Sequence, residues 1–243
     1  MASPEAHRMK FMIEFCNHPP FEVITEKDWE SCVAYWTRCM AHPSYLRIED
    51  KAVFKAHGFH YFMVQNGHDL EQCRARLDSL RAAARARGVG DLLIGCGVSA
   101  HEAVASGHPA AGIFDFTGTY MDLPPLPQRE EAYPYSELTS FIVEGRMLHL
   151  NDAIPHMPFV AAGWSPRPWP DPRAYFTFPT RVEWLDALRT VKTSLATHKQ
   201  LGLPGAKAFT IYAWNEFGEG GFVAPTQGEG YLKLEGIREV FAR

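Results

Sequence analysis

Short apolar runs alternate with segments of helical periodicity along most of the chain. The apolar runs predict buried strands at residues 10–16, 91–99, 111–120, 157–164 and 208–217, and one more strand within residues 52–65. Apolar positions three and four residues apart predict helices at 26–43, 69–88, 180–202 and 230–243. Thr25 fits the N-cap of the first helix, and Gly88 fits the end of the second. This alternation predicts an α/β protein with a parallel sheet.

The order of these elements favours a TIM-like (β/α) barrel, whose functional loops follow the C-terminal ends of the strands. Long loops follow the predicted strands at 111–120 and 157–164, as that architecture requires. A closed barrel has eight strands, and the pattern gives about six. Two strands are therefore hidden in the weaker stretches 99–110 and 133–156, or the chain begins inside the architecture. No repeat or linker divides residues 1–243, which predicts a single domain.

Composition and charge exclude several classes of protein. The net charge is −4, and no run of Lys and Arg interleaves with aromatic residues, so nucleic acid is not an expected partner. No stretch of 18 apolar residues predicts a membrane span, and no signal-peptide pattern is found, so a cytoplasmic location is expected. Five cysteines without a C-x-x-C pair fit buried thiols in a reducing compartment better than disulfides or a zinc site.

The stretch "IYAWNEFGEGG" places two acids, Glu216 and Glu219, just after a predicted strand. Residues three apart on a strand point to opposite faces, so both acids can serve one site only if the chain leaves the strand after about Trp214. The glycines that follow permit such a turn. Enzymes that cleave glycosidic bonds commonly use two carboxyl groups about 5–10 Å apart. Asn215 could hydrogen-bond a sugar or a carboxylate, and Trp214 offers an apolar face. From spacing alone, two acids in a surface loop are an equally good interpretation.

The segment "AWNEFGEGGFVAPTQGEGYLKLEGI" resembles the last strand and loop of WbsX-type, glycoside hydrolase family 99-like proteins, which carry an N-E-[WF]-x-E-G block, then a Pro and a terminal helix. Residues 42–58, 114–120 and 162–169 are similar to other strands and strand ends of that family, and the likeness runs from about residue 10 to the end. It implies a TIM-like barrel that cleaves α-mannosidic linkages inside a glycan chain with retention, without a metal or other cofactor. Carried over, Glu216 is the base on the sugar 2-hydroxyl, which gives an anhydro-sugar intermediate. Glu219 is the acid/base at the glycosidic oxygen.

Two departures from that family affect the expectation. Ser165 stands where the family usually has Asp, which changes a substrate contact if the Asp makes one. The family also has two strands and their helices before the segment that matches residues 10–18. The chain is therefore expected to be a fragment or a shortened form with six of eight strands. An open barrel exposes strand edges, so a homodimer or a covering segment is expected.

Several other residues are candidates for substrate binding. Asp115 is an acid in an apolar strand that Tyr120 ends, and Asn17 ends the first strand before two prolines. Arg167 lies in a Pro-rich loop with Trp164 and Trp169, of a kind that suits sugar stacking. His57 is a candidate polar residue of the site. With His60 it forms too poor a set to predict a metal.

The sequence thus predicts a glycan-processing enzyme whose partner is an oligosaccharide or polysaccharide substrate. Two alternatives remain open. One is a polysaccharide-biosynthesis glycosyltransferase, which the absence of a Gly-rich phosphate loop and of a D-x-D motif makes less attractive. The other is a non-catalytic, glycan-binding barrel.

Overall fold

The computed structural model describes residues 5–201 and 207–242 and divides the chain into two compact units. Unit 1 comprises Met1–Val98 and Val104–Thr117, and unit 2 comprises Ser99–Ala103 and Gly118–Arg243. The predicted helix ends at residues 202 and 243 lie outside the described residues. The expectation of a single domain stays a prediction.

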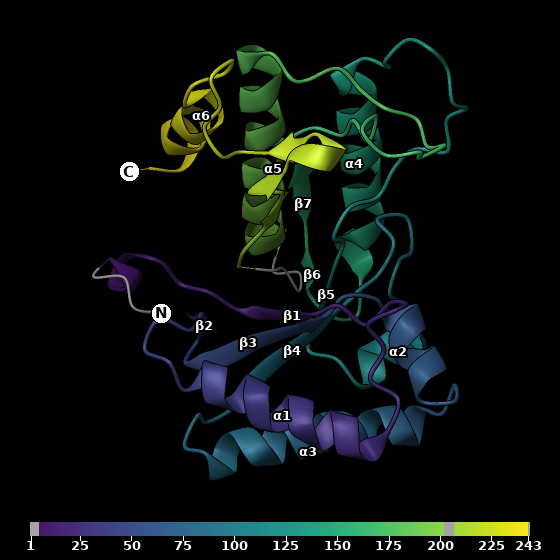
Figure 1. Cartoon of the computed structure of the whole chain (residues 1–243), viewed down its shortest axis with the longest axis vertical. Coiled ribbons are helices and arrows are strands. Elements are labelled where there is room, and N and C mark those ends of the chain that lie inside the picture. The colour runs from purple at the N-terminus through teal and green to yellow at the C-terminus, as the bar shows by residue number, and fades with distance from the viewer. Residues whose placement is uncertain (1–4, 202–206, 243) are drawn as a thin grey trace. The chain divides into compact units, whose positions relative to one another are not determined.

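The helices and strands of unit 1 follow the predicted order, with the short strand β2 and helix α2 in addition (Figure 1). They are η1 Ala6–Arg8, β1 Ile13–Phe15, α1 Glu26–Met40, β2 Arg47–Ile48, β3 Lys51–Ala56, α2 Phe59–Gln65, α3 Leu70–Ala86, β4 Leu92–Gly97 and η2 Pro109–Gly112. Strand β5, Phe116–Gly118, begins at the end of this unit.

Unit 2 is richer in helix. Its elements are α4 Tyr135–Leu148, η3 His149–Asn151, β6 His156–Met157, β7 Phe159–Ala161, α5 Arg181–Leu201, β8 Thr210–Tyr212, β9 Asn215–Glu216, η4 Phe217–Glu219, β10 Gly221–Phe222 and α6 Leu232–Phe241. Among the described residues, none of the helices combines the length and the apolar character that crossing a membrane requires.

The sheet of unit 1 is built on the parallel strands β1, β3 and β4, with β2 antiparallel to β3. Phe54 in β3 lies opposite Ile13 on one side and Ile94 on the other. Every residue of β3 after Lys51 is buried, on both faces of the strand. A continuous apolar run is what a strand covered on both faces requires, so the parallel sheet predicted here is confirmed.

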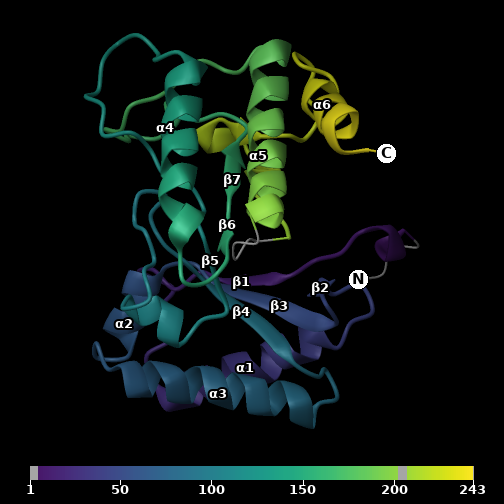
Figure 2. The same ribbon diagram turned by 180° about the vertical axis from the view of Figure 1, so that it is seen from behind.

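Helices α1 and α3 lie side by side on one face of this sheet (Figures 1 and 2). The Trp36 ring of α1 packs between Phe15 and Phe54 of the sheet, with ring centroids 5.1 and 5.0 Å away. The Trp29 indole N–H donates to Ser79 Oγ of α3 at 2.9 Å. Thr25 caps α1 by accepting from the Asp28 N–H, so the predicted start of this helix is confirmed.

The strand expected within 52–65 is β3, and the later part of that range forms helix α2, whose Phe62 is fully buried. Two other segments differ from the elements that the sequence pattern predicts. Residues 109–112 form a 3-10 helix that starts at a proline, which delays β5. Within 133–156 the chain forms helix α4, not a hidden strand, followed by the two-residue β6, and no strand occurs in 99–110.

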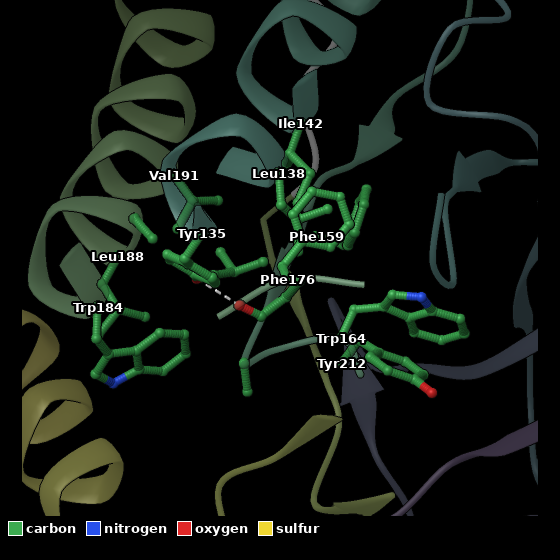
Figure 3. Packing of buried hydrophobic residues seen from close by; sticks show 14 of the residues in the cluster. Tyr135, Leu138, Ile142, Phe159, Trp164, Phe176, Trp184, Leu188, Val191 and Tyr212 are labelled. Carbon is green, nitrogen blue, oxygen red and sulfur yellow. Dashed lines mark hydrogen bonds between the residues drawn. The ribbon is translucent and has the colours of Figure 1, made fainter. Parts of the chain in front are cut away.

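The core of unit 2 lies between α4, α5 and the parallel pair β7–β8. Helix α4 was missed because its buried positions, Tyr135, Leu138 and Ile142, stand among polar residues and small side chains. Figure 3 shows aromatic rings from α4, β7 and β8 among the aliphatic side chains of both helices. The Tyr135 hydroxyl is fully buried and donates to the Ala161 carbonyl of β7 at 2.6 Å. This bond joins the helix to the strand pair.

A buried polar cluster of His149, Asp152 and His156 follows α4. His149 Nδ1 lies 2.7 Å from Asp152 Oδ2, its Nε2 lies 3.1 Å from the Ala100 carbonyl, and its ring stacks on His156 at 3.5 Å. We expect Asp152→Ala to lower the free energy of unfolding by about 1–3 kcal/mol, because a buried ring nitrogen loses its acceptor. Urea unfolding of a double-mutant cycle with His149→Ala measures the coupling. Additive effects would contradict a direct interaction.

Candidate active site

The acidic hairpin, residues 214–222, follows β8. Strand β8 ends at Tyr212, and the peptide bond to Ala213 is cis. Strands β9 and β10 pair in antiparallel register, with Glu216 opposite Gly221. The 3-10 helix Phe217–Glu219 joins them, and Gly220 closes it with φ +71°. The departure from the strand that the two acids require is therefore present.

Two glycines let this hairpin pack against the loop that follows β7. A Cβ on Gly220 would lie 2.7 Å from the Ser165 nitrogen, and one on Gly218 would lie 2.7 Å from Trp169 Nε1. The Ser165 N–H donates to the Glu219 carbonyl at 2.6 Å. The backbone of Glu219 is thus fixed by a bond that does not involve its side chain.

Tyr212 holds the carboxylate of Glu219. Its side chain is 2% exposed, and its hydroxyl donates to Glu219 Oε2. Burial raises the pKa of Tyr212 most, and the hydrogen bond and charge of Glu219 raise it further, with a smaller contribution from Glu216. The phenol therefore stays protonated and remains a donor. Both acids lie within electrostatic range of this one hydroxyl.

The ring of Tyr212 is itself held by aromatic neighbours. Tyr120 packs edge-on at 5.1 Å between ring centroids, and Trp164 lies at 5.9 Å. Figure 3 shows Trp164 beside Tyr212, whose hydroxyl points away from the aliphatic cluster. The tyrosine thereby carries a polar tip from the core to the hairpin.

The other predicted residues of the hairpin face solvent. Glu216 and Asn215 are exposed, and the Trp214 ring is 56% exposed. Glu219 is half-buried. One acid is thus fixed by Tyr212, and the other is open to a ligand.

The loop after β7 contributes Arg167 and Trp169, both exposed. The Arg167 guanidinium lies 4.5 Å from the centroid of the Tyr175 ring. Trp164 requires a correction, because it is 2% exposed and donates its indole N–H to the Ala174 carbonyl. It supports Tyr212 and offers no open face on which a sugar could stack.

Asn17 and Asp115 lie in unit 1 and make structural contacts there. Asn17 is fully buried, and its amide bonds both the N–H and the carbonyl of Gly58 at 2.9 Å, which fixes the turn after β3. Asp115 Oδ2 accepts from the Ile94 N–H at 2.8 Å and lies 3.3 Å from Arg81 Nη2. Substrate contacts for these two residues stay predictions.

His57, also in unit 1, belongs to a charged cluster that sequence reasoning missed. Glu14 Oε1 lies 2.8 Å from His57 Nδ1 and 2.9 Å from Lys55 Nζ, and the Lys55 side chain is only 2% exposed. Glu14 is an acid inside the apolar run 10–16. The same kind of pattern made Asp115 a candidate, so it could also have pointed to Glu14. Burial tends to raise the pKa of Glu14, but the His57 hydrogen bond and the Lys55 charge outweigh it and lower that pKa.

This lowered pKa predicts an acid-dependent loss of stability. A carboxyl whose folded-state pKa is depressed stabilises the fold above its ordinary pKa of 4.5, and the contribution is lost as the pH falls toward the folded-state value. Between about pH 3 and pH 7 we expect the free energy of unfolding of Glu14→Gln to fall less on acidification than that of the wild type. Glu30→Gln, an exposed acid on α1, is the control and should follow the wild type. Parallel wild-type and Glu14→Gln curves would contradict the assignment.

One group of His and acidic side chains among the described residues is close enough to be tested as a metal site. It is His149, Asp152 and His156, whose ligand atoms lie within 4.8 Å of one another. The two imidazoles are stacked 3.5 Å apart with an interplanar angle of 4°. A bound metal must lie near the plane of each ligating ring, and one ion cannot lie in two parallel planes. The cluster therefore suits hydrogen bonding and not a metal.

The fold can be compared with known proteins. No protein-family model matches the sequence, and no curated protein is significantly similar to it. The structure is similar to that of the GH99 endo-α-mannosidase from Bacteroides thetaiotaomicron, with 14% identity and a TM-score of 0.51. The match covers 96% of this chain and 64% of that one. The same enzyme in complex with bis-tris propane gives 15% identity and a TM-score of 0.56 over 96% and 68% of the two chains.

This likeness shows the fold. The chain has an α/β fold of the TIM-like (β/α)-barrel class, as predicted. A GH26 β-mannanase from Bacteroides ovatus is also similar, at 11% identity over 89% of this chain and 56% of that one, but its TM-score of 0.46 is too low to bear on the fold. The chain spans less than two thirds of the length of the first GH99 structure.

Proposed function

We propose that the protein is a glycan-processing enzyme, a retaining glycoside hydrolase that cleaves α-linked, mannose-type glycans. The observation that carries the proposal is the acidic hairpin itself. It presents an exposed Glu216 and a Glu219 fixed by Tyr212 at the end of β8. In a (β/α) barrel the chemistry takes place at such strand ends. The WbsX-type, family 99-like resemblance of the same segment supports the same reaction.

The roles follow from that resemblance. Glu219 donates a proton to the glycosidic oxygen as the bond to the anomeric carbon breaks. Glu216 takes the proton of the 2-hydroxyl, whose oxygen forms the new bond to that carbon and gives an anhydro sugar. Water then opens this ring with Glu219 as base, while Glu216 returns its proton to the 2-oxygen, so both carboxyl groups are restored and the configuration is retained. Asn215, Trp214 and Tyr120 are exposed and available to bind the sugar rings.

Hydrolysis of α-mannan oligosaccharides by the full chain tests the proposal. We expect shorter oligosaccharides whose first-formed anomer, observed by proton NMR before mutarotation, is α. A β anomer would reject retention. Binding of the oligosaccharides without turnover would reject the enzyme and leave a glycan-binding barrel.

A further inference from the structure

A pocket of about 620 Å³ opens beside the acidic hairpin in unit 2. The loops around residues 128–130 and 166–175 line it, and its size is that of a sugar-binding site. Trp169, one wall of the pocket, packs on Gly218 between the two glutamates, as the close approach of its ring to that glycine shows. The pocket therefore adjoins the proposed site of cleavage.

The pocket is cationic although the chain has a net charge of −4. Three arginines, Arg129, Arg167 and Arg173, line it with two acids, Glu130 and Asp171. Arg173 binds both oxygens of Asp171 at 2.5–3.0 Å, so these two charges cancel locally. The remaining charged residues of the pocket are two arginines, Arg129 and Arg167, and one acid, Glu130.

The two remaining guanidinium groups are held by aromatic rings. Arg129 lies 3.5 Å from the centroid of Tyr133 and donates to the carbonyls of Glu131 and Ala132. Arg167 stands between two prolines and is stacked on Tyr175 at 4.5 Å. No ion pair of either arginine occurs within the described part of the chain. Stacking uses the faces of a guanidinium and leaves N–H groups along its edge, the geometry that receives a carboxylate or a phosphate.

We propose that this arginine pocket is a subsite for a sugar unit that carries an anionic group, either a carboxylate or a phosphate ester. The proposal rests on the proposed function and narrows its substrate to an acidic α-linked glycan. Arg167 receives the anionic group because its donors have no protein acceptor among the described residues, and Trp169 covers the sugar ring. Arg129 adds a second positive charge to the same pocket.

Binding of three probes to the full chain tests the subsite without any need for turnover. The probes are methyl α-D-mannoside, methyl α-D-glucuronide and mannose 6-phosphate, titrated by calorimetry at low ionic strength. We expect at least one charged probe to bind about tenfold more tightly than the neutral one, with a preference that falls as salt is added. Which charged probe binds tighter tells whether the subsite takes a carboxylate or a phosphate ester.

Two variants make the test specific. Arg167→Gln should abolish the preference for the charged probe and leave the neutral one unchanged. Arg189→Gln, an exposed arginine of α5 that pairs with Asp186, should behave as the wild type. Equal binding of charged and neutral probes, or a preference that survives Arg167→Gln, would overturn the subsite. If neutral α-mannans are hydrolysed and charged probes bind no more tightly than the neutral one, only the subsite is overturned. If charged probes bind more tightly but no α-linked glycan is hydrolysed, only the proposed hydrolase is overturned.

Discussion

Replacing Glu219 with glutamine is expected to lower kcat/KM for an α-linked oligosaccharide by about 10²–10⁴-fold, the range that loss of a general acid/base produces. Glutamine keeps the shape of the side chain, and its amide oxygen can still accept from the Tyr212 hydroxyl. The variant should therefore fold and bind substrate normally. Initial rates and thermal unfolding, measured on the same preparation, separate loss of chemistry from loss of structure.

Companion variants sharpen this test. Glu216→Gln should cause a loss of similar size, because the second carboxyl is the base of the proposed reaction. Tyr212→Phe removes only the hydroxyl that fixes Glu219, so a smaller fall in kcat is expected. Glu235→Gln, an exposed acid of α6, is the matched control and should leave the rate unchanged. Turnover that is insensitive to Glu219→Gln would remove Glu219 from the mechanism.

The turn beside the two acids could be anticipated from the sequence because its requirement is local. Two acids three residues apart need a turn to reach one site, and the glycines that follow permit one, so a departure from the strand after about Trp214 was expected. Strand β8 ends two residues earlier, at Tyr212. The partner of Glu219 could not be anticipated. Tyr212 lies in the strand "TIY", and its pattern indicates burial but not that its hydroxyl reaches an acid seven residues later.

The composition of the loop after β7 predicted less about the positions of its side chains. A Trp-rich loop predicts sugar stacking, but it does not tell which ring faces solvent. Trp169 is 57% exposed, whereas Trp164 is buried behind Tyr212. The difference depends on packing against residues distant in sequence, which a single sequence does not reveal.

Pairing between distant segments also explains why the charged cluster of Glu14, Lys55 and His57 in unit 1 was not predicted. Glu14 is 41 residues from Lys55 and 43 from His57, and parallel strands bring the three together. Helix α4 escaped prediction for another reason, because its apolar positions are diluted by Ser, Thr and Glu. The Glu14 cluster and helix α4 both depend on tertiary contacts, about which hydrophobic periodicity alone gives too little information.

Trp184 anchors α6 to α5, and its removal is expected to have the largest effect on stability. The side chain is fully buried, its indole N–H donates to the Lys233 carbonyl at 2.9 Å, and its ring lies so close to Gly236 that a Cβ there would be 2.7 Å from it. Trp184→Ala therefore leaves a large cavity and removes the hydrogen bond to the Lys233 carbonyl. We expect the free energy of unfolding to fall by about 3–5 kcal/mol.

The matched control is Trp214→Ala, which removes the same side chain at a position where it is 56% exposed and should change the free energy of unfolding by about 0.5 kcal/mol or less. Gly236→Ala tests the contact from the other helix, because its added methyl group must displace the Trp184 ring, at a cost of about 1–3 kcal/mol. If the ring is the anchor, Gly236→Ala should cost little in a Trp184→Ala background, where the methyl group enters the cavity. Guanidinium unfolding of the four variants gives these values. Additive losses in the double variant would show that α6 is held to α5 by other contacts.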